Sequence, residues 1–269
     1  GCHRECCQLY WEGKEKKRSV VALGIVDPKT KKIWMIDASP DFPDQLKELQ
    51  QQLGTDYQAL PAGIFLSHAH IGHYTGLMYL GREVIGADKI PVYAMPLMER
   101  FLKNNGPWNQ LIKLNNIQIN PLKTDSAIQI SKNLRVRPFL VPHRQEYSET
   151  VGFWIEGPRQ KILYITDIDK WDHWERDIRE EIKKVDVAFL DATFYNNQEI
   201  PHRDMSEIPH PFIEESLALF TSLSPAEKAK VHFIHFNHSN PVFKAGAAGR
   251  NLEKKGYHIA KEGQIIPLE

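Results

Sequence analysis

The sequence predicts an α/β protein in which strands and helices alternate along two successive halves of the chain. Short apolar runs of strand length are separated by segments whose apolar residues recur at helical spacing. Several of these runs end directly in a histidine or an aspartate, as expected where strands deliver side chains to one edge of a sheet. The 269 residues, 42% of them hydrophobic, suffice for one large core. We therefore predict a single domain, residues 1–269, built from two packed halves.

The predicted elements follow one another in a regular order. Strands are expected at residues 32–36, 64–66, 91–94, 117–119, 127–130, 134–141, 151–156, 161–166, 185–190, 230–235 and 257–266. Helices are expected at residues 42–53, 75–80, 97–104, 171–184, 212–223 and 243–255. Residues 196–211 form a polar, proline-punctuated insertion without periodicity, which is typical of a functional loop.

Charge and hydropathy argue against several classes of function. Lys plus Arg and Asp plus Glu each total 34, and this balance argues against general binding to nucleic acids or membrane surfaces. No stretch approaches the roughly 20 apolar residues of a membrane span, and no signal-peptide pattern is present. The chain begins at Gly1-Cys2 without an initiator methionine, so a lost leader or a lost first strand is open. Both a cytoplasmic and an exported, periplasmic location therefore remain open.

A cluster of histidines predicts a metal site. The segment Ser67–His73 reads Ser-His-Ala-His-Ile-Gly-His and directly follows an expected strand. Alternation along an extended segment places His68 and His70 on one side, so both imidazoles can reach one ion. A turn at Gly72 is expected to re-aim His73 toward a second position. One short segment could therefore serve two metal ions.

Three cysteines lie within the first seven residues. An odd number of cysteines crowded together does not suit a disulfide framework, whereas three thiolates and one histidine make a closed tetrahedral zinc site. Such a zinc would hold a short terminal loop that has little core of its own. We predict that Cys2, Cys6 and Cys7 bind zinc. The alternative is a local redox-active pair plus a free thiol.

Three further candidate ligands end apolar runs. His143 follows residues 139–142, Asp167 follows 162–166, and His235 follows 231–234. Each alone is an ordinary residue at the end of a strand, but together they are what a sheet enzyme needs to assemble a site at one edge. The sequence therefore predicts a metalloenzyme.

These residues and motifs resemble the metallo-β-lactamase-fold superfamily. The resemblance rests on His68-Ala69-His70-Ile71-Gly72-His73 with His143, Asp167 and His235, and it spans nearly the whole chain. Within the superfamily the chain is most similar to the branch of the pyrroloquinoline-quinone biosynthesis B protein and the cyclic phosphodiesterase of the carbon–phosphorus lyase pathway. The branch-specific features are the cysteine cluster and the segments 141–143, 151–153, 164–167 and 235–241. The resemblance implies a four-layer αββα sandwich with a dinuclear metal site.

The resemblance also implies an assignment of ligands. It gives the first metal to His68, His70 and His143, the second to His73 and His235, and makes Asp167, also a candidate catalytic residue, the bridge. The family pattern His-x-His-x-Asp-His has an aspartate where this chain has Gly72, so the second site lacks one carboxylate. A weaker second site, a different preferred metal and a single-metal enzyme are all open.

The motif at residues 235–241 contains two histidines with different expected roles. In the phosphodiesterase branch the first such histidine serves the reaction and the second joins a structural zinc. By this resemblance His235 is the catalytic-site ligand, and His238 completes the zinc site of Cys2, Cys6 and Cys7. The opposite assignment, with His238 at the catalytic site and His235 a buried strand histidine, is the alternative.

We predict a hydrolase in which one or two Zn²⁺ ions, or Mn²⁺ or Fe, activate a water molecule. The expected substrate is a phosphodiester or a similar small anionic ester. His210, in the long loop, is the predicted proton donor, and His202 is a second candidate. Asp37 is expected to hydrogen-bond a ligand histidine. Candidates for anion contacts are Arg144, Arg203 and Lys244.

Other functions are open on the same residues. One is an iron-dependent oxygenase resembling the pyrroloquinoline-quinone biosynthesis B protein, and another is hydrolysis of β-lactams or lactones. A third is a noncatalytic binding scaffold, which the retention of all the expected ligands makes least attractive. The expected partner is a small-molecule substrate, and a homodimer is open.

Overall fold

The structure is a computed structural model, and it describes residues 2–243 and 247–269. The chain divides into two compact units. The first unit comprises residues 19–140 and 144–153, and the second comprises residues 1–18, 141–143 and 154–269. Strand β8 (Val151–Glu156) runs from the first unit into the second. The expectation of one domain over the whole chain stays a prediction.

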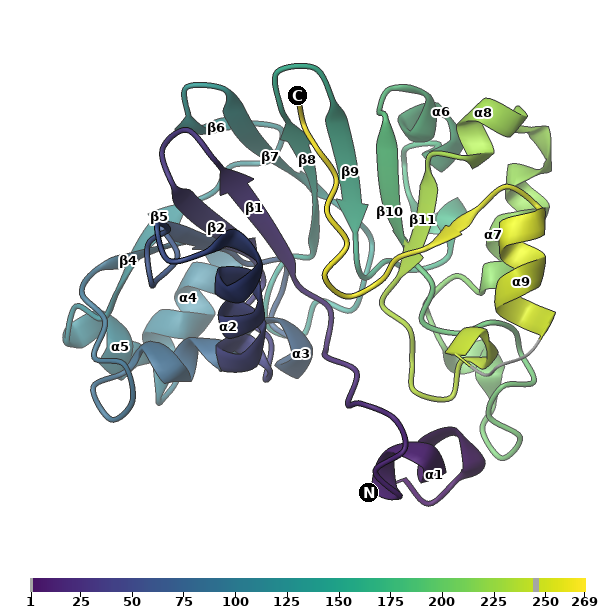
Figure 1. The fold of residues 1–269 in the computed structure, drawn as a ribbon, viewed down its shortest axis with the longest axis horizontal. Coiled ribbons are helices and arrows are strands. Elements are labelled where there is room, and N and C mark those ends of the chain that lie inside the picture. Colours follow the sequence, from purple (N-terminus) through teal and green to yellow (C-terminus); the bar gives the residue numbers. More distant parts are fainter. Residues whose placement is uncertain (1, 244–246) are drawn as a thin grey trace. The chain divides into compact units, whose positions relative to one another are not determined.

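The first unit contains a five-stranded sheet of order β1-β2-β3-β4-β5 (Figure 1). The β1–β2 pair is antiparallel and the other pairs are parallel. The strands are β1 (Leu23–Asp27), β2 (Lys32–Ile36), β3 (Gly63–Phe65), β4 (Ile90–Ala94) and β5 (Ile117–Pro121). The helices are α2 (Phe42–Leu53), α3 (Ile71–Tyr74), α4 (Pro96–Asn104) and α5 (Trp108–Lys113), with a 3₁₀ helix at Thr75–Leu80. Strands β6 (Ile128–Ser131) and β7 (Leu134–Leu140) also belong to this unit and pair antiparallel.

The core of the first unit lies between the sheet and its helices. Apolar side chains of the strands, such as Ile64 and Val92, pack with apolar side chains of the helices, such as Phe42, Leu77 and Leu102. Gly76 allows the closest approach, because a Cβ there would lie 2.1 Å from the Ser39 carbonyl oxygen. This contact presses the segment after the histidine motif onto the end of β2, where Asp37 lies.

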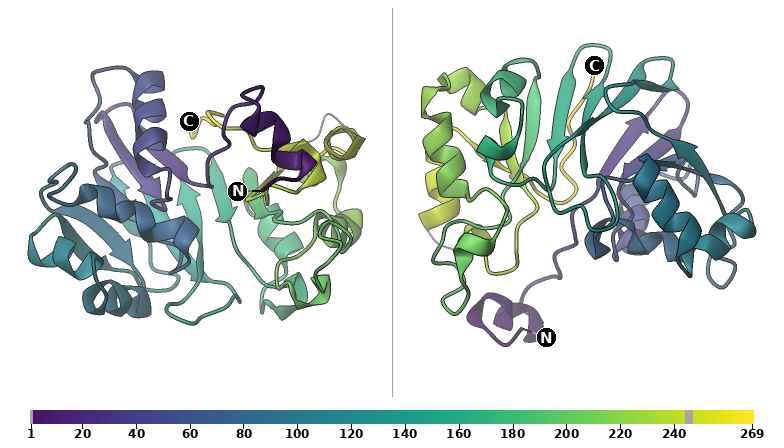
Figure 2. Two further views of the ribbon diagram at one scale, coloured as in Figure 1. Left: turned by 90° about the horizontal axis from the view of Figure 1, so that it is seen from below. Right: turned by 180° about the vertical axis from the view of Figure 1, so that it is seen from behind.

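The second unit contains parallel strands in the order β12-β11-β10-β9. They are β9 (Lys161–Ile165), β10 (Val187–Asp191), β11 (Val231–Ile234) and β12 (His258–Ile259). The helices are α1 (Glu5–Trp11), α6 (Ile178–Lys183), α7 (Ile213–Leu219), α8 (Pro225–Lys228) and α9 (Ala247–Lys254). Short 3₁₀ helices lie at Trp171–His173, Met205–Glu207, Phe220–Ser222 and Pro241–Phe243. The C-terminal tail runs beside β8 and β9, where the Leu268 carbonyl accepts the Arg159 amide at 3.2 Å (Figures 1 and 2).

The long loop at residues 196–211 has a small core of its own. Phe194, Met205, Ile208 and Phe212 are buried together, and Ile200 packs against them. Backbone hydrogen bonds from Ile213 and Glu214 to the carbonyls of residues 194 and 195 close the base of the loop. His210 is therefore held between two buried anchors of this core, although the loop has no regular period.

Several expected elements differ from the structure. Strand β1 and helix α5 were not predicted, and the expected N-terminal loop contains the helix α1. The strand expected at residues 257–266 covers only His258–Ile259, because a polar turn follows. The helix expected at 171–184 is a 3₁₀ turn and the separate helix α6, because the side chain of Asp177 caps the amide of Arg179 and starts α6 there. Residues 244–246 of the helix expected at 243–255, including Lys244, lie outside the described residues.

Across the described residues, 2–243 and 247–269, no helix combines the length and the hydropathy that crossing a bilayer requires.

Candidate metal centres

The histidine motif gathers its three imidazoles at the carboxyl end of β3. The ring centroid of His68 lies 4.5 Å from that of His70 and 4.2 Å from that of His73. His68 Nε2 lies 2.9 Å from His70 Nδ1. Two nitrogens bound to one tetrahedral ion at ~2.1 Å would be about 3.4 Å apart, so this pair is already near a ligand spacing.

Each imidazole of the motif has an outer hydrogen-bond partner. His68 Nδ1 lies 3.0 Å from Ser67 Oγ, and His70 Nε2 lies 3.3 Å from Glu146 Oε2. His73 Nδ1 lies 2.7 Å from Asp37 Oδ2. A metal-binding histidine uses its second nitrogen in this way, which fixes the tautomer and the ring orientation. The ring nitrogens opposite these outer contacts are Nε2 of His68, Nδ1 of His70 and Nε2 of His73.

Asp37 links two parts of the motif. It follows β2, is fully buried, and has a φ of +67°. Its carboxylate accepts the Ser67 amide and the Ser67 hydroxyl, each at 2.8 Å, in addition to its contact with His73. A non-glycine residue held at positive φ is strained, and several hydrogen bonds here hold it in place. Asp37 therefore orients the His73 ring through its Nδ1 atom. The expected hydrogen bond between Asp37 and a histidine of the motif is confirmed.

The turn expected at Gly72 is the short helix α3, Ile71–Tyr74, which contains both Gly72 and His73. The φ of Gly72 does not lie in the left-handed region, so the chain turns here through a helix and not through a glycine conformation. A Cβ at this position would meet only Val20 Cγ1, at an ordinary 3.4 Å. The backbone therefore has room for the aspartate of the family pattern.

In the second unit, His143, Asp167 and His235 converge. His143 Nε2 lies 3.6 Å from Asp167 Oδ1, and His235 Nε2 lies 3.4 Å from Asp167 Oδ2. The opposite ring nitrogens again have outer partners, Asp169 Oδ1 at 3.1 Å for His143 and Thr193 Oγ1 at 2.8 Å for His235. A carboxylate whose two oxygens each face one imidazole has the arrangement of a bridging ligand.

His210 lies beside this group and is paired with a buried carboxylate. Its Nδ1 lies 2.6 Å from Asp191 Oδ2, and its ring centroid lies 5.0 Å from that of His143. Burial lowers the pKa of His210, but the charge and hydrogen bond of Asp191 raise it more, so the net pKa is above the ordinary value. Burial raises the pKa of Asp191, but His210 and His235 lower it further, so this carboxyl stays ionised.

Sequence reasoning missed four of these outer partners. Asp191 ends the apolar run of β10, the same signal that identified the ligands at other strand ends, and it was overlooked. Thr193 lies two residues further and also bonds Asp191 Oδ1, at 2.7 Å. Asp169 and Glu146 follow ligand positions in loops without a distinguishing pattern. Their roles follow only from the structure, which shows their contacts with the ring nitrogens of His143 and His70.

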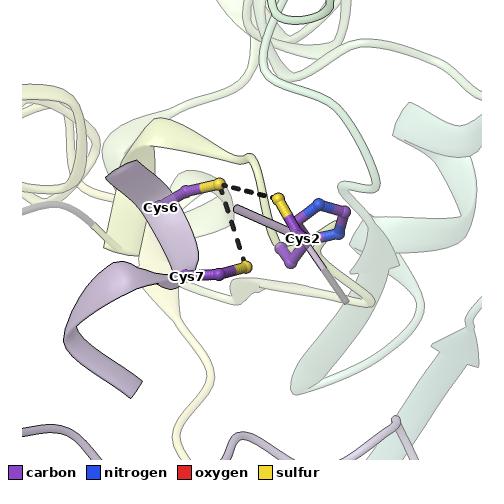
Figure 3. Close-up of side chains that lie close together, drawn as sticks. Cys2, Cys6 and Cys7 are labelled. Atoms are coloured by element: carbon purple, nitrogen blue, oxygen red, sulfur yellow. Dashed lines mark hydrogen bonds between the residues drawn. The ribbon is translucent and has the colours of Figure 1, made fainter. Parts of the chain in front are cut away.

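The cysteines form a second cluster with His238. The ligand atoms of Cys2, Cys6, Cys7 and His238 all lie within 4.8 Å of one another. Cys6 Sγ lies 4.0 Å from Cys2 Sγ and 3.9 Å from Cys7 Sγ (Figure 3). Two thiolates on one tetrahedral zinc at ~2.3 Å would be about 3.8 Å apart. All three cysteines are free, so none of them forms a disulfide.

Crowding of the three thiols disfavours the ionised form of Cys7. Burial and the thiols of Cys2 and Cys6 raise the pKa of Cys7 to about 11. A hydrogen bond from the Arg4 amide, at 3.4 Å, lowers the pKa of Cys2. Cysteine binds zinc as the thiolate, so a zinc ion here would displace the thiol protons. The Cys2 proton would leave more easily than the Cys7 proton, because the pKa of Cys2 is the lower of the two.

The remaining candidates divide between these groups and the exposed surface. His238 is grouped with the cysteines and His235 with Asp167, which is the arrangement of the first assignment rather than its alternative. His202 and Arg203 are exposed on the long loop. Arg144 is 58% exposed and lies 3.8 Å from Glu146.

Comparison with known proteins identifies the family. Residues 34–235 match the model of the beta-lactamase superfamily domain. The chain belongs to this superfamily. The metallo-β-lactamase fold predicted from the sequence, an α/β architecture with two sheets and covering helices, is confirmed.

Curated relatives of this superfamily member span nearly its whole length. The chain is 22% identical to "Coenzyme PQQ synthesis protein B" of Methylorubrum extorquens strain PA1, over 99% of this chain and 94% of that protein. It is 22% identical to the protein of the same name from Xanthomonas axonopodis pv. citri, with the same coverage. These matches confirm the resemblance to the pyrroloquinoline-quinone biosynthesis branch.

Solved structures with the same fold include zinc-bound PqqB from Methylobacterium extorquens, with a TM-score of 0.76 and 19% identity over 98% of this chain and 93% of that one. A diphosphatase of the PhnP family has a TM-score of 0.63 at 21% identity, over 98% and 89% of the two chains. The short form of human tRNase Z has a TM-score of 0.59 at 14% identity, over 95% of each. The fold is thus one of metal-dependent enzymes, and the His and Asp groups support metal binding.

Proposed function

We propose that this protein is a metal-dependent hydrolase that directs a metal-activated hydroxide at a phosphodiester or a similar small anionic ester. The observation that carries the proposal is the outer hydrogen bond on each histidine assigned to the catalytic centre, from His73–Asp37 at 2.7 Å to His70–Glu146 at 3.3 Å. Such bonds orient one ring nitrogen outward and leave the other for an ion. A chance cluster of surface histidines would not have this regular pattern.

The proposed centre uses the ligand assignment that the family resemblance implies. We assign the first ion to His68, His70 and His143, the second to His73 and His235, and the bridging position to Asp167. Zn²⁺ is the expected metal, with Mn²⁺ or Fe as alternatives, because imidazole and carboxylate ligands suit all three. The second position has one carboxylate fewer than the family pattern, because Gly72 stands in its place.

When bound, the ions would lower the pKa of a coordinated water and stabilise negative charge that develops on the substrate. The protein's own part is the transfer of a proton to the leaving group. His210 suits this role because Asp191 engages its Nδ1 at 2.6 Å and raises its pKa, which leaves a protonated Nε2 as the donor. Thr193 hydrogen-bonds both Asp191 and His235, and so links the partner of His210 to a proposed metal ligand.

The choice of a phosphoester is supported by fold neighbours and by charge. The neighbours include a diphosphatase and a tRNase, names that denote hydrolysis at phosphorus. A dinuclear centre beside a protonated imidazole favours a substrate that is itself an anion. We propose that the reacting group is a phosphodiester for these reasons.

A second candidate is an iron-dependent oxygenase. The curated relatives are named for synthesis of coenzyme PQQ rather than for hydrolysis. Replacement of the usual aspartate by Gly72 leaves a histidine-rich second position, which suits iron as well as zinc. Metal content separates the two candidates, since iron with oxygen consumption would favour the oxygenase.

We also propose a structural zinc bound by Cys2, Cys6, Cys7 and His238. The sulfur separations of 3.9 and 4.0 Å match those of thiolates on one tetrahedral ion. This zinc would hold helix α1, none of whose residues is buried, on the second unit.

The first test is elemental analysis of protein purified without added metal, for the wild type, Cys6→Ser and His70→Ala. The proposal expects about three ions in the wild type, loss of one in Cys6→Ser, and loss at the histidine cluster in His70→Ala. Bis(p-nitrophenyl) phosphate hydrolysis should vanish only in His70→Ala. Unchanged metal content in His70→Ala would refute the catalytic assignment.

The role of His210 is tested by comparing leaving groups. An alkyl leaving group needs a proton, whereas p-nitrophenolate hardly does, so His210→Ala should slow alkyl phosphodiester hydrolysis about 100-fold more than p-nitrophenyl ester hydrolysis. His202→Ala, on the same loop, is the matched control and should slow neither. Equal losses on both esters in His210→Ala would show that this residue is not the acid.

A further inference from the structure

Two of the most exposed apolar side chains directly follow His70 and its partner Glu146 in the chain. Among the described residues only Ile71, Val84, Tyr147 and Ile265 are large apolar side chains more than 60% exposed, and Tyr147 is 63% exposed. Ile71, at 71%, directly follows His70 in the chain. Tyr147 follows Glu146, the partner of His70. Exposed apolar side chains scattered singly need no explanation, but two of them beside one candidate ligand do.

The backbone around Tyr147 is held firmly against the histidine motif. Ser148 Oγ accepts the Ala69 amide at 2.8 Å, and the Val151 amide donates to the Ser67 carbonyl at 3.1 Å. The Glu149 carboxylate accepts the Leu97 amide at the start of α4, at 3.0 Å. The backbone at Tyr147 is thus held from both sides, by the Glu146 contact with His70 before it and by these hydrogen bonds after it. The exposure of the ring does not result from a loose loop.

The ring itself rests on an aromatic support. Its centroid lies 5.4 Å from that of Phe101, which in turn lies 5.3 Å from Tyr74 and 5.8 Å from Trp108. These spacings are those of favourable aromatic pairs. One side of the Tyr147 ring therefore packs on Phe101, while most of the residue stays open to solvent.

We propose that Tyr147 is a specificity-determining residue, an aromatic platform that selects substrates carrying a planar ring next to the anionic group. The inference rests on the proposed hydrolase function and adds a substrate class to it. A ring that stacks on a preordered aromatic side chain loses little conformational freedom, because Tyr147 is already fixed by its neighbours. Ile71 supplies an apolar side chain next to His70, from the same unit.

The test uses the metal-reconstituted protein and two product analogues, phenyl phosphate and ethyl phosphate, with binding measured by isothermal titration calorimetry. The wild type should bind phenyl phosphate more tightly, and Tyr147→Leu should weaken that binding roughly three- to tenfold while leaving ethyl phosphate unchanged. Tyr147→Phe should keep the preference. Tyr57→Leu makes the same exchange beside Lys31, near the turn between β1 and β2, and is the matched control.

The outcomes separate this inference from the function on which it rests. Equal affinity of the wild type for the two phosphates, or an equal loss of both in Tyr147→Leu, overturns the platform alone. No binding of either phosphate overturns the proposed function and the platform with it. A changed oligomeric state in Tyr147→Leu, with the ligand preference intact, would show that the ring instead covers another copy of the chain.

Discussion

The two candidate metal clusters are prepared for metal in opposite ways. The candidate catalytic histidines are buried or half-buried, and each is oriented by an outer partner such as Asp37, Asp169 or Thr193. In the cysteine cluster no ligand is buried, and Cys6 and Cys7 lie on α1, a helix with no buried residue. The first cluster is built by the fold and should keep its geometry without an ion. The second is built by its ion, which replaces a hydrophobic core for α1.

Cys6→Ser gives the strongest test of the statement that an ion holds α1 in place. We expect loss of one zinc and of hydrogen-exchange protection throughout α1, because nothing else in that helix is buried. The midpoint of thermal unfolding should change little, since α1 contributes nothing to the core. His3→Ser, in the same exposed segment, is the control and should retain both zinc and protection. Protection that survives in Cys6→Ser would mean that α1 is held by packing.

Asp37→Asn tests the other side of the comparison. It should lower metal affinity at the histidine cluster by about 10- to 100-fold, the effect typical of an outer partner, and leave the cysteine zinc in place. Competition with a chromogenic chelator measures the metal affinity of the histidine ligands and the retention of the cysteine zinc. Asp44→Asn, an exposed aspartate in the first turn of α2, should change neither affinity. An unchanged affinity in Asp37→Asn would mean that His73 needs no support.

A histidine pair without carboxylate partners extends the comparison. His232 on β11 stacks on His258 at 4.6 Å, with Phe189 on a neighbouring strand and Gln264 Nε2 3.4 Å from its Nδ1. Burial, and then the charge of His258, lowers the pKa of His232 to about 4. The unfolded chain binds the proton at its ordinary pKa near 6.5, so this stability is complete above pH 6.5 and is lost as the pH falls toward 4.

The expected loss of unfolding free energy from this group is about 1–2 kcal/mol between pH 7 and pH 5. His232→Phe should remove that part of the pH dependence, as measured by chemical denaturation at several pH values. His258→Gln should remove only the part of the His232 pKa shift that the charge of His258 causes. An unaltered pH profile in His232→Phe would contradict the assigned pKa.

Gly72→Asp has the smallest expected effect. Restoring the carboxylate should raise affinity for the second ion by up to about tenfold, because it adds a negative charge where the backbone has room. Gly72→Asn has the same shape without the charge and serves as the control. Equal effects of the two substitutions would show that the charge at this position does not matter.

Much of the site was predictable because the ligands mark the ends of strands. His68, Asp167 and His235 each follow an apolar run that ends at one edge of a sheet, and this placement depends on local pattern alone. Asp191 carries the same signal, but its role depends on His210, which reaches it from a loop with no period. The turn at Gly72 was predicted, but its form as the short helix α3 was not. Strand β1 was missed although it forms a local hairpin with β2, across the short turn at residues 28–31.

The small core beneath residues 196–211 has a consequence for how this enzyme could be altered. Phe194, Met205, Ile208 and Phe212 anchor the loop, whereas the stretch around His202 and Arg203 is exposed. Residues in that exposed stretch can be exchanged, lengthened or shortened without displacing the imidazole at 210. The anchoring core and the exposed stretch of this loop are therefore mechanically separate, and changes in the second should leave the position of His210 intact.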